Sequence, residues 1–373
     1  MSCTAVMSDT PSVSPRDGEV LDETYTRMHT TGPEFEGWLS NHGPMAADAL
    51  IRLGCGEEVE AWVDSYVPRL DEAPAPRWDI EEAEWREVVG DPSRLGDWCA
   101  LFDRQLREEP WRDVLVRWWP RLLDGAVASA AHGLIRTGHA VRALLELPTA
   151  PRRAELAQAL GYWAARHQPL PAHPSPHGGA DPATALDAVP VISTSGGIRT
   201  RLRDLARTPS WPVTVARLRG APQPGQVPAA LDTVVDEAVT RYGRWAHGSP
   251  IMLVHAATAP RAARLVLPAL PEHLWVPTYE AAWAVTAAIS TIYRPSTPPP
   301  PTSRSEQQTV TPEQVTLCAI ATRDEHAIKF VEVAQESHHR GNSHALAAGA
   351  RASHLIAPVD YDDDSHDRRN QSR

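Results

Sequence analysis

The chain has 373 residues, of which 42 % are apolar and 22 % are charged, a composition typical of a globular domain rather than a disordered chain. Its formal net charge of −11 and its lack of any Lys- or Arg-rich run argue against nucleic acid and acidic membranes as partners, because both attract cations. The four cysteines form no CxxC pair, and neither a secretory signal nor a membrane-length apolar run is present. We therefore expect a cytoplasmic protein without a transmembrane segment.

The two ends of the chain lack a core-forming pattern. Residues 1–18 are rich in Ser, Thr, Pro and Asp, and residues 359–373 are highly charged, so we expect both segments to be disordered. One folded domain would then span residues 19–358. Within it, residues 167–182 and 294–305 are rich in proline and predict long loops, and the prolines at 298–301 predict an extended polyproline II spacer.

Between these loops, apolar residues recur at helical spacing, and Pro and Gly stand where helices begin or end. The predicted fold is therefore all-α, a mostly helical single domain. Short β-like runs such as "VPVIST" are too few to build a sheet. The clearest predicted helices begin at Pro110, lie between Gly125 and Pro148, run from Pro151 to about Gln168, and begin after the capping residue Thr311.

Histidine is the commonest ligand of transition metals, and this chain has 16 histidines. Six of them fall in loops, at a helix end or near the C-terminal tail, where a solvent or capping role is expected: His173, His177, His338, His339, His354 and His366. Four others stand in apolar or capping contexts, where an unpaired imidazole would cost roughly 1–3 kcal/mol. These four are His42, His132, His255 and His326. They suggest a metal centre, although each alone also fits a buried, hydrogen-bonded ring.

His139 follows His132 by seven residues and lies on nearly the same helix face. The residues alone leave open which of the two is a ligand and whether both line one pocket. No HExxH, HxH or 2-His-1-carboxylate spacing narrows the choice.

Lys329 is the only lysine in a chain with 35 arginines, since Lys and Arg together number 36. On a helix, His326 and Lys329 stand at positions i and i+3 and project from one side. A desolvated lysine amine can become neutral, whereas a guanidinium stays protonated. A neutral amine can form a Schiff base, act as a base, or add carbon dioxide to give a carbamate, and the residues do not distinguish these roles.

Five segments give the chain a resemblance to the questin oxidase-like family, whose mostly fungal and actinobacterial members are associated with aromatic polyketide biosynthesis. The segments follow the family's order and cover most of the folded part. They are "NHGPMAADALIRLG" (41–54), "HGLIRTGHAVRALLELP" (132–148), "ELAQALGYWAARHQPL" (155–170), "MLVHAATA" (252–259) and "DEHAIKFVEVA" (324–334).

This resemblance implies an oxygenase that opens the central ring of an anthraquinone with a Baeyer–Villiger-like outcome. Related members hold a non-haem iron with four histidines and a carboxylated lysine. Carried over to this chain, the metal ligands are His42, His132, His255, His326 and Lys329.

The resemblance also implies roles for residues around the metal. Fungal members carry a motif similar to H-P-L-I-H-x-G-Y on the helix of His132, so His132 is expected to be the ligand and His139 to line the pocket. This chain departs from that motif at Gly133, Arg136 and His139. Residues expected to orient the ligands or the carbamate are Asn41, Thr258 and Glu332.

The expected function is that of an Fe(II)-dependent oxygenase, with dioxygen as co-substrate and a small aromatic molecule as substrate. We expect the tryptophan-rich helices to offer stacking surface and to exclude water. NADPH could serve as reductant, but no GxGxxG motif supports a nicotinamide site. Two alternatives are a metal-dependent hydrolase and a non-catalytic helical protein that binds an aromatic ligand. The sequence does not indicate an oligomeric state.

Overall fold

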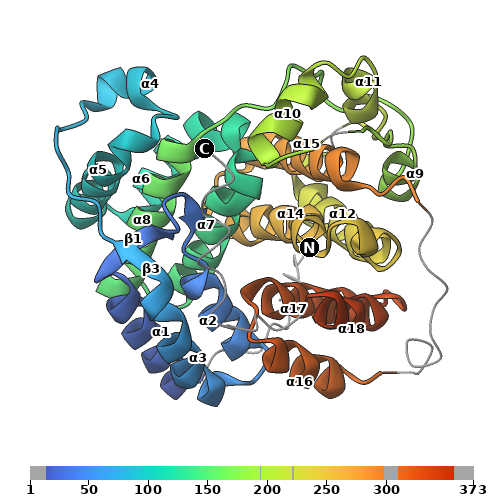
Figure 1. Ribbon diagram of the computed structural model, residues 1–373. Coiled ribbons are helices and arrows are strands. Elements are labelled where there is room, and N and C mark those ends of the chain that lie inside the picture. Colours follow the sequence, from blue (N-terminus) through green and yellow to red (C-terminus); the bar gives the residue numbers. More distant parts are fainter. Residues whose placement is uncertain (1–13, 194, 221, 298–309, 357–373) are drawn as a thin grey trace, which may run out of the picture.

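The computed structural model describes residues 14–193, 195–220, 222–297 and 310–356. In this part the chain forms a mostly helical single domain, as predicted (Figure 1). The expected disordered tail at 359–373, residues 1–13 and the predicted spacer at 298–301 lie outside the described residues. No helix in the described ranges is both long enough and apolar enough to cross a lipid bilayer.

The α-helices follow one another along the whole described chain. In the first half they are α1 (Pro15–Met28), α2 (Gly43–Arg52), α3 (Val59–Tyr66), α4 (Trp85–Val88), α5 (Leu95–Glu108), α6 (Trp111–Leu122), α7 (Ala128–Glu146) and α8 (Ala150–Arg166). In the second half they are α9 (Pro182–Asp187), α10 (Ile198–Ala206), α11 (Trp211–Ala216), α12 (Val227–Trp245), α13 (Pro250–Leu253), α14 (His255–Val266), α15 (Trp275–Tyr293), α16 (Pro312–Thr322), α17 (Glu325–His339) and α18 (Ala345–Leu355).

A small antiparallel sheet, which the sequence did not predict, lies next to the first helices. Its central strand β1 (Thr31–Phe35) pairs with β2 (Leu39–Ser40) on one side and with β3 (Leu70–Glu72) on the other. The backbone N–H of Asn41 donates to the carbonyl of Pro33 and so continues the contact beyond β2. The sheet therefore fixes the backbone just before His42.

Local signals explain the helix boundaries that were predicted correctly. Thr149 caps α8 by accepting a hydrogen bond from the N–H of Arg152, and the helix ends three residues before Pro169. Thr311 and Gln314 form a capping box at the start of α16. Helices α6 and α7 also occupy their predicted positions.

The prediction of disorder up to residue 18 is wrong for residues 15–18, which form the first turn of α1. The Ser14 hydroxyl accepts a hydrogen bond from the N–H of Asp17, and Pro15 stands at the first helical position. These two local signals start the helix although the surrounding sequence is polar.

Helices α2, α7, α14 and α17 form a closed ring in the middle of the protein (Figure 1). Helix α2 packs against α7 and α17, and α14 packs against the same two helices. Outside this ring, α8 covers α7 and α5 packs on α8, whereas α12 and α15 cover α14. Six tryptophan rings are fully buried and serve core packing: Trp98, Trp118, Trp119, Trp163, Trp211 and Trp283.

Candidate metal centre

Four histidines from the four ring helices meet in the interior of the protein. The Nε2 atom of His132 lies 2.7 Å from Nε2 of His42 and 3.1 Å from Nε2 of His255. The ring centroid of His326 lies 4.7 Å from that of His42 and 5.4 Å from that of His255. All four side chains are buried. We call these four residues the histidine cluster.

Each member of the cluster stands at the N-terminal end of its helix. His42 precedes α2, His255 is the first residue of α14, and His326 is the second residue of α17. His132 begins the right-handed part of α7, because the three residues before it have left-handed backbone angles. Four positive helix ends therefore meet here, which disfavours protonated imidazoles and favours an anionic group among them.

The tautomers of two cluster members follow from their backbone partners. The Nδ1–H of His132 donates to the carbonyl of Ser129, and the Nδ1–H of His255 donates to the carbonyl of Met252. A neutral imidazole carries one N–H, so Nε2 of both rings presents a lone pair. The two lone pairs face one another at 3.1 Å. Two lone pairs at this distance repel each other, and a cation between them would be coordinated by both. A backbone carbonyl that accepts from Nδ1–H is also a typical partner of metal-binding histidines.

The spacing of the nitrogen atoms also fits a shared metal ion. Metal–imidazole bonds of about 2.1 Å at right angles place two ligand nitrogens about 3 Å apart. The separations of 2.7 and 3.1 Å lie on either side of this value. Ligand atoms of His42, His132 and His326 all lie within 4.8 Å of one another. The donor set therefore fits a transition metal, for which imidazole is a preferred ligand.

Burial keeps three members of the cluster neutral. It lowers the pKa of His42, His132 and His255 well below the ordinary value, and the nearby positive charge of Lys329 lowers the pKa of all three further. Neutral imidazoles are the form that binds metals.

A strained turn positions His132. Ser129, Ala130 and Ala131 have φ angles of 48°, 58° and 66°, a left-handed conformation that costs roughly 1–2 kcal/mol per non-glycine residue. This turn directs the carbonyl of Ser129 to the Nδ1–H of His132, 2.5 Å away. Strain of this kind is retained where the surrounding structure or a function requires it.

Two acidic residues at the start of α17 face the other side of the cluster. The carboxylate of Asp324 caps α17 and lies 3.3 Å from Nδ1 of His326, and the carboxylate of Glu325 lies 3.8 Å from Nδ1 of His42. Neither contact has hydrogen-bond geometry, so both Nδ1 atoms are buried without a hydrogen-bond partner among the residues that the structure describes. A small rotation of either ring would bring its Nδ1–H to a carboxylate, the second common arrangement around metal-bound histidines.

Lys329 lies one turn after His326 on α17 and is 1 % exposed. Burial lowers the pKa of its amine to about 8, although Glu325 and Asp324 act in the opposite direction. Within the described chain, no carboxylate lies within ion-pair distance of this amine. A share of the amine is therefore neutral near pH 7 and open to reaction.

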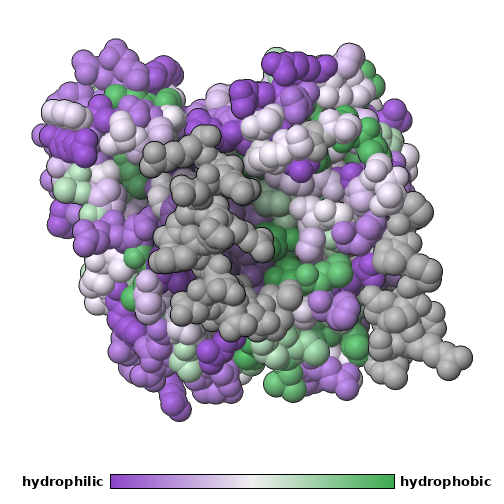
Figure 2. Space-filling model, viewed as in Figure 1, coloured by the Kyte–Doolittle hydropathy of each residue, from purple (hydrophilic) through white to green (hydrophobic). Residues whose placement is uncertain are grey.

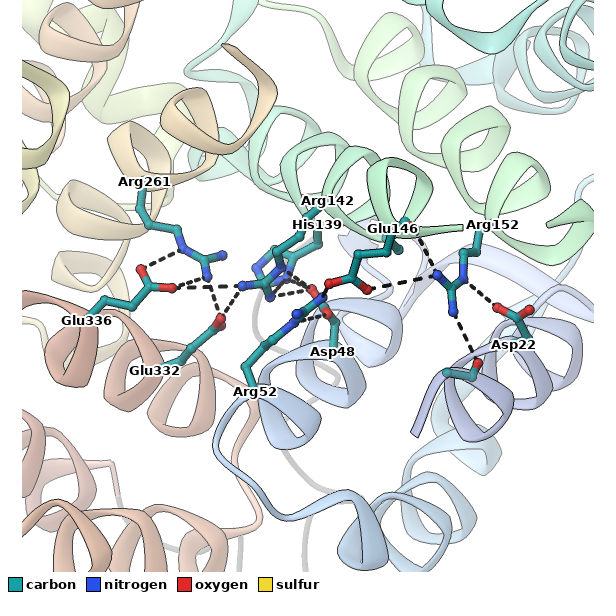
Figure 3. A network of polar contacts seen from close by, with 12 residues as sticks. Asp22, Asp48, Arg52, His139, Arg142, Glu146, Arg152, Arg261, Glu332 and Glu336 are labelled. Atoms are coloured by element: carbon teal, nitrogen blue, oxygen red, sulfur yellow. Dashed lines mark hydrogen bonds and ion pairs between the residues drawn. The ribbon is translucent and has the colours of Figure 1, made fainter. Parts of the chain in front are cut away.

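A network of buried ion pairs (Figure 3) lies farther toward the C-terminal ends of the same four helices. Arg142 donates to the carboxylates of Asp48 and Glu332, and Arg261 donates to Glu332 and to Glu336. We call these five residues the ionic layer. Burial alone would raise the pKa of Asp48, but the positive charges of Arg142 and its other neighbours hold that pKa well below the ordinary value.

The remaining predicted site residues have polar partners other than the histidine rings of the cluster. Nδ1 of His139 lies 2.8 Å from the carboxylate of Asp48, and Glu332 belongs to the ionic layer. The side chain of Asn41 accepts a hydrogen bond from the N–H of Gly43 and so shapes the start of α2 next to His42. Thr258 donates to the carbonyl of Val254 in its own helix. The structure thus brings the five predicted ligands into one region, whereas His139 and Glu332 contact the charged residues farther along the helices.

The departures from the family motif have structural partners in this chain. A side chain at position 133 would meet the Cβ atom of Trp163 at 2.6 Å, so Gly133 allows α7 to pack closely on α8. Arg136 is fully buried in an ion pair with Glu155, at 2.5 Å from Nε to Oε1. These contacts connect α7 to α8 rather than to the histidine cluster.

Sequence reasoning missed the left-handed turn at 129–131 and the carboxylates of Asp324 and Glu325. The turn is built from Ser and Ala, which carry no signal for this conformation. Asp324 had a usable signal, because an Asp just before an apolar helical segment is a favoured N-cap.

Comparison of this chain with models of known protein families and with curated proteins gave no match.

Proposed function

We propose that this protein is a non-haem iron oxygenase that opens a ring of an aromatic polyketide of the anthraquinone type. The observation that carries the proposal is the convergence of four buried imidazoles beside the only lysine of the chain. The resemblance to the questin oxidase-like family supports the choice of iron, dioxygen and an aromatic substrate. A cytoplasmic location and a possible use of NADPH belong to the same proposal.

The histidine cluster supplies four neutral nitrogen ligands to a divalent ion. In our proposal Lys329 supplies the fifth ligand as a carbamate, formed when its neutral amine adds carbon dioxide and releases one proton. The carbamate is an anion among four positive helix ends, so the dipoles stabilise it. With Fe(II), four imidazoles and one carbamate, the net charge of the site is about +1.

Iron bound in this way would supply activation of dioxygen for attack next to a ring carbonyl of the substrate. The protein contributes a dry site, since apolar neighbours such as Ala131 and Ile328 are fully buried. A cavity of about 140 Å³ opens at Ser129, beside the turn that precedes His132, and Trp38 and Arg199 also line it. We assign the approach of the substrate to this side, where an indole ring can stack on an aromatic ring.

The test is metal content and oxygen uptake of the purified full-length chain. We expect about one iron per chain and oxygen uptake with a hydroxyanthraquinone, both lost when Lys329→Arg removes the amine that forms the carbamate. Arg107→Lys is the matched control, because the Arg107 side chain is 71 % exposed and pairs with its neighbour Asp103 along α5. Wild-type iron content and uptake in Lys329→Arg would refute the lysine ligand, and bound metal without oxygen uptake would favour a hydrolase.

A further inference from the structure

The ionic layer lies about two to three helical turns beyond the histidine cluster on the same four helices. Asp48 follows His42 by six residues, Arg261 follows His255 by six, and Glu332 follows His326 by six. Arg142 follows His132 by ten residues on α7. A spacing of six residues corresponds to about 9 Å along a helix. Each helix that carries a histidine of the cluster therefore also carries a charged residue of the layer.

Arg142 is the centre of this layer (Figure 3). Its Nε and Nη2 atoms donate to Asp48 of α2, and its Nη1 atom donates to Glu332 of α17. Arg261 of α14 reaches the same oxygen of Glu332 and holds Glu336 through two nitrogens, at 2.7 and 3.1 Å. All four helices of the ring are thus connected through two guanidinium groups.

The helices of the ring leave little room to absorb a shift. Between His132 and Arg142, the backbone at Gly138 lies so close to α14 that an added Cβ atom would meet Ala262 Cβ at 2.7 Å. Planar guanidinium–carboxylate pairs are directional, and a slide of one helix by a turn, about 5.4 Å, would separate every pair. Apolar packing alone is less selective, because similar contacts are available in neighbouring registers.

We propose that the ionic layer positions the histidine cluster, with Arg142 as its central positioning residue, so that the four Nε2 atoms are held ready for a metal ion. The inference rests on the proposed metal centre. Ligand atoms must be held within about 0.5 Å of the productive geometry, and the layer provides this by setting the axial register of α2, α7, α14 and α17. This positioning role would also explain why the protein buries charged residues that take no part in the proposed reaction.

The experiment compares Arg142→Lys with Arg152→Lys in the full-length chain. Lysine keeps the charge but cannot bridge two carboxylates with a planar fork. Arg152 is also a buried guanidinium; it lies on α8, outside the four-helix ring, and binds Asp22 and the carbonyl of Ala143. Cobalt(II) is the probe, since calorimetry reports its affinity and its visible absorption reports the ligand geometry.

We expect both variants to be less stable toward urea, but only Arg142→Lys to bind cobalt about 10-fold or more weakly and with an altered visible spectrum. Arg261→Lys should weaken cobalt binding and alter the visible spectrum in the same way as Arg142→Lys. It replaces Arg142→Lys as the test if that variant does not fold. Wild-type cobalt affinity and spectrum in both ring variants would overturn the inference. Cobalt binding requires no turnover. A wild-type chain that binds cobalt, but takes up no oxygen when it holds iron, would refute the proposed reaction and leave this comparison valid.

Discussion

The Nε2 atoms of His132 and His255 lie 3.1 Å apart, although each ring uses its Nδ1–H in a hydrogen bond to a backbone carbonyl. Two neutral imidazoles in these tautomers direct lone pairs at one another. This arrangement is unfavourable in an apolar interior unless a cation is shared. The relationship between the two residues is therefore the most specific sign of a metal site in this protein.

The first prediction concerns the two histidines of α7. His132→Ala removes the nitrogen that lies next to both His42 and His255, so we expect iron or cobalt affinity to fall by roughly 100-fold or more. His139→Ala removes a ring bound to Asp48, outside the cluster, and should leave metal affinity within about threefold. Calorimetric titration measures both. The opposite pattern would make His139 the ligand instead of His132.

The second prediction concerns the strained turn. Ser129→Gly removes the Cβ atom that makes a φ of 48° unfavourable. Glycine also has a larger backbone entropy in the unfolded chain, which opposes this gain. We expect the free energy of unfolding to rise by a net value of about 0.5–1 kcal/mol. Ser129→Ala, which keeps a Cβ atom, should change stability by less than about 0.5 kcal/mol. Urea denaturation provides the measurement. A loss of stability in Ser129→Gly would mean that the turn is not strained.

The third prediction concerns the contact between α7 and α8. Gly133→Ala places a methyl group 2.6 Å from Cβ of Trp163, so we expect a loss of about 1–3 kcal/mol in the free energy of unfolding. The matched control is Gly243→Ala in α12, where the nearest atom is 3.8 Å away. There, the higher helix propensity of alanine should add about 0.5–1 kcal/mol. Equal effects of the two substitutions in urea denaturation would contradict this assignment.

The fourth prediction concerns acid stability. Burial would raise the pKa of Glu336, but the positive charge of Arg261 and the hydrogen bonds from it outweigh burial and lower the pKa from 4.5 to about 2. The group therefore stabilises the fold above pH 4.5, and this contribution is lost as the pH falls from about 4.5 to about 2. Since its side chain is 32 % exposed, we expect about 1–2 kcal/mol rather than the roughly 3 kcal/mol of a fully buried group.

The measurement for this prediction is the free energy of unfolding in urea at several pH values. Glu336→Gln should be less stable than the wild type at pH 6 and should show a shallower fall between pH 4.5 and 2.5. Parallel curves for the two proteins would show that another carboxylate accounts for the acid sensitivity.

Much of the fold could be predicted from the sequence because helix formation is decided locally. Caps such as Thr311, first-turn prolines and apolar residues at a period of 3.6 determine where a helix begins and ends, and each signal acts over a few residues. The same local geometry placed His326 and Lys329 on one side of α17. The sequence alone thus determined a helical protein with a small set of buried histidines and a single lysine.

Only the tertiary structure decided which of these residues meet. His42 and His132 are 90 residues apart, and His132 and His255 are 123 residues apart, so their contact depends on the packing of α2, α7 and α14 rather than on any local pattern. The same holds for Arg142 and its carboxylates, and for the left-handed turn, whose strain is retained because the surrounding core holds it. Long-range packing leaves no periodic trace along the chain, so the residues alone left open which histidines meet, and the folded protein shows that the four members of the cluster do.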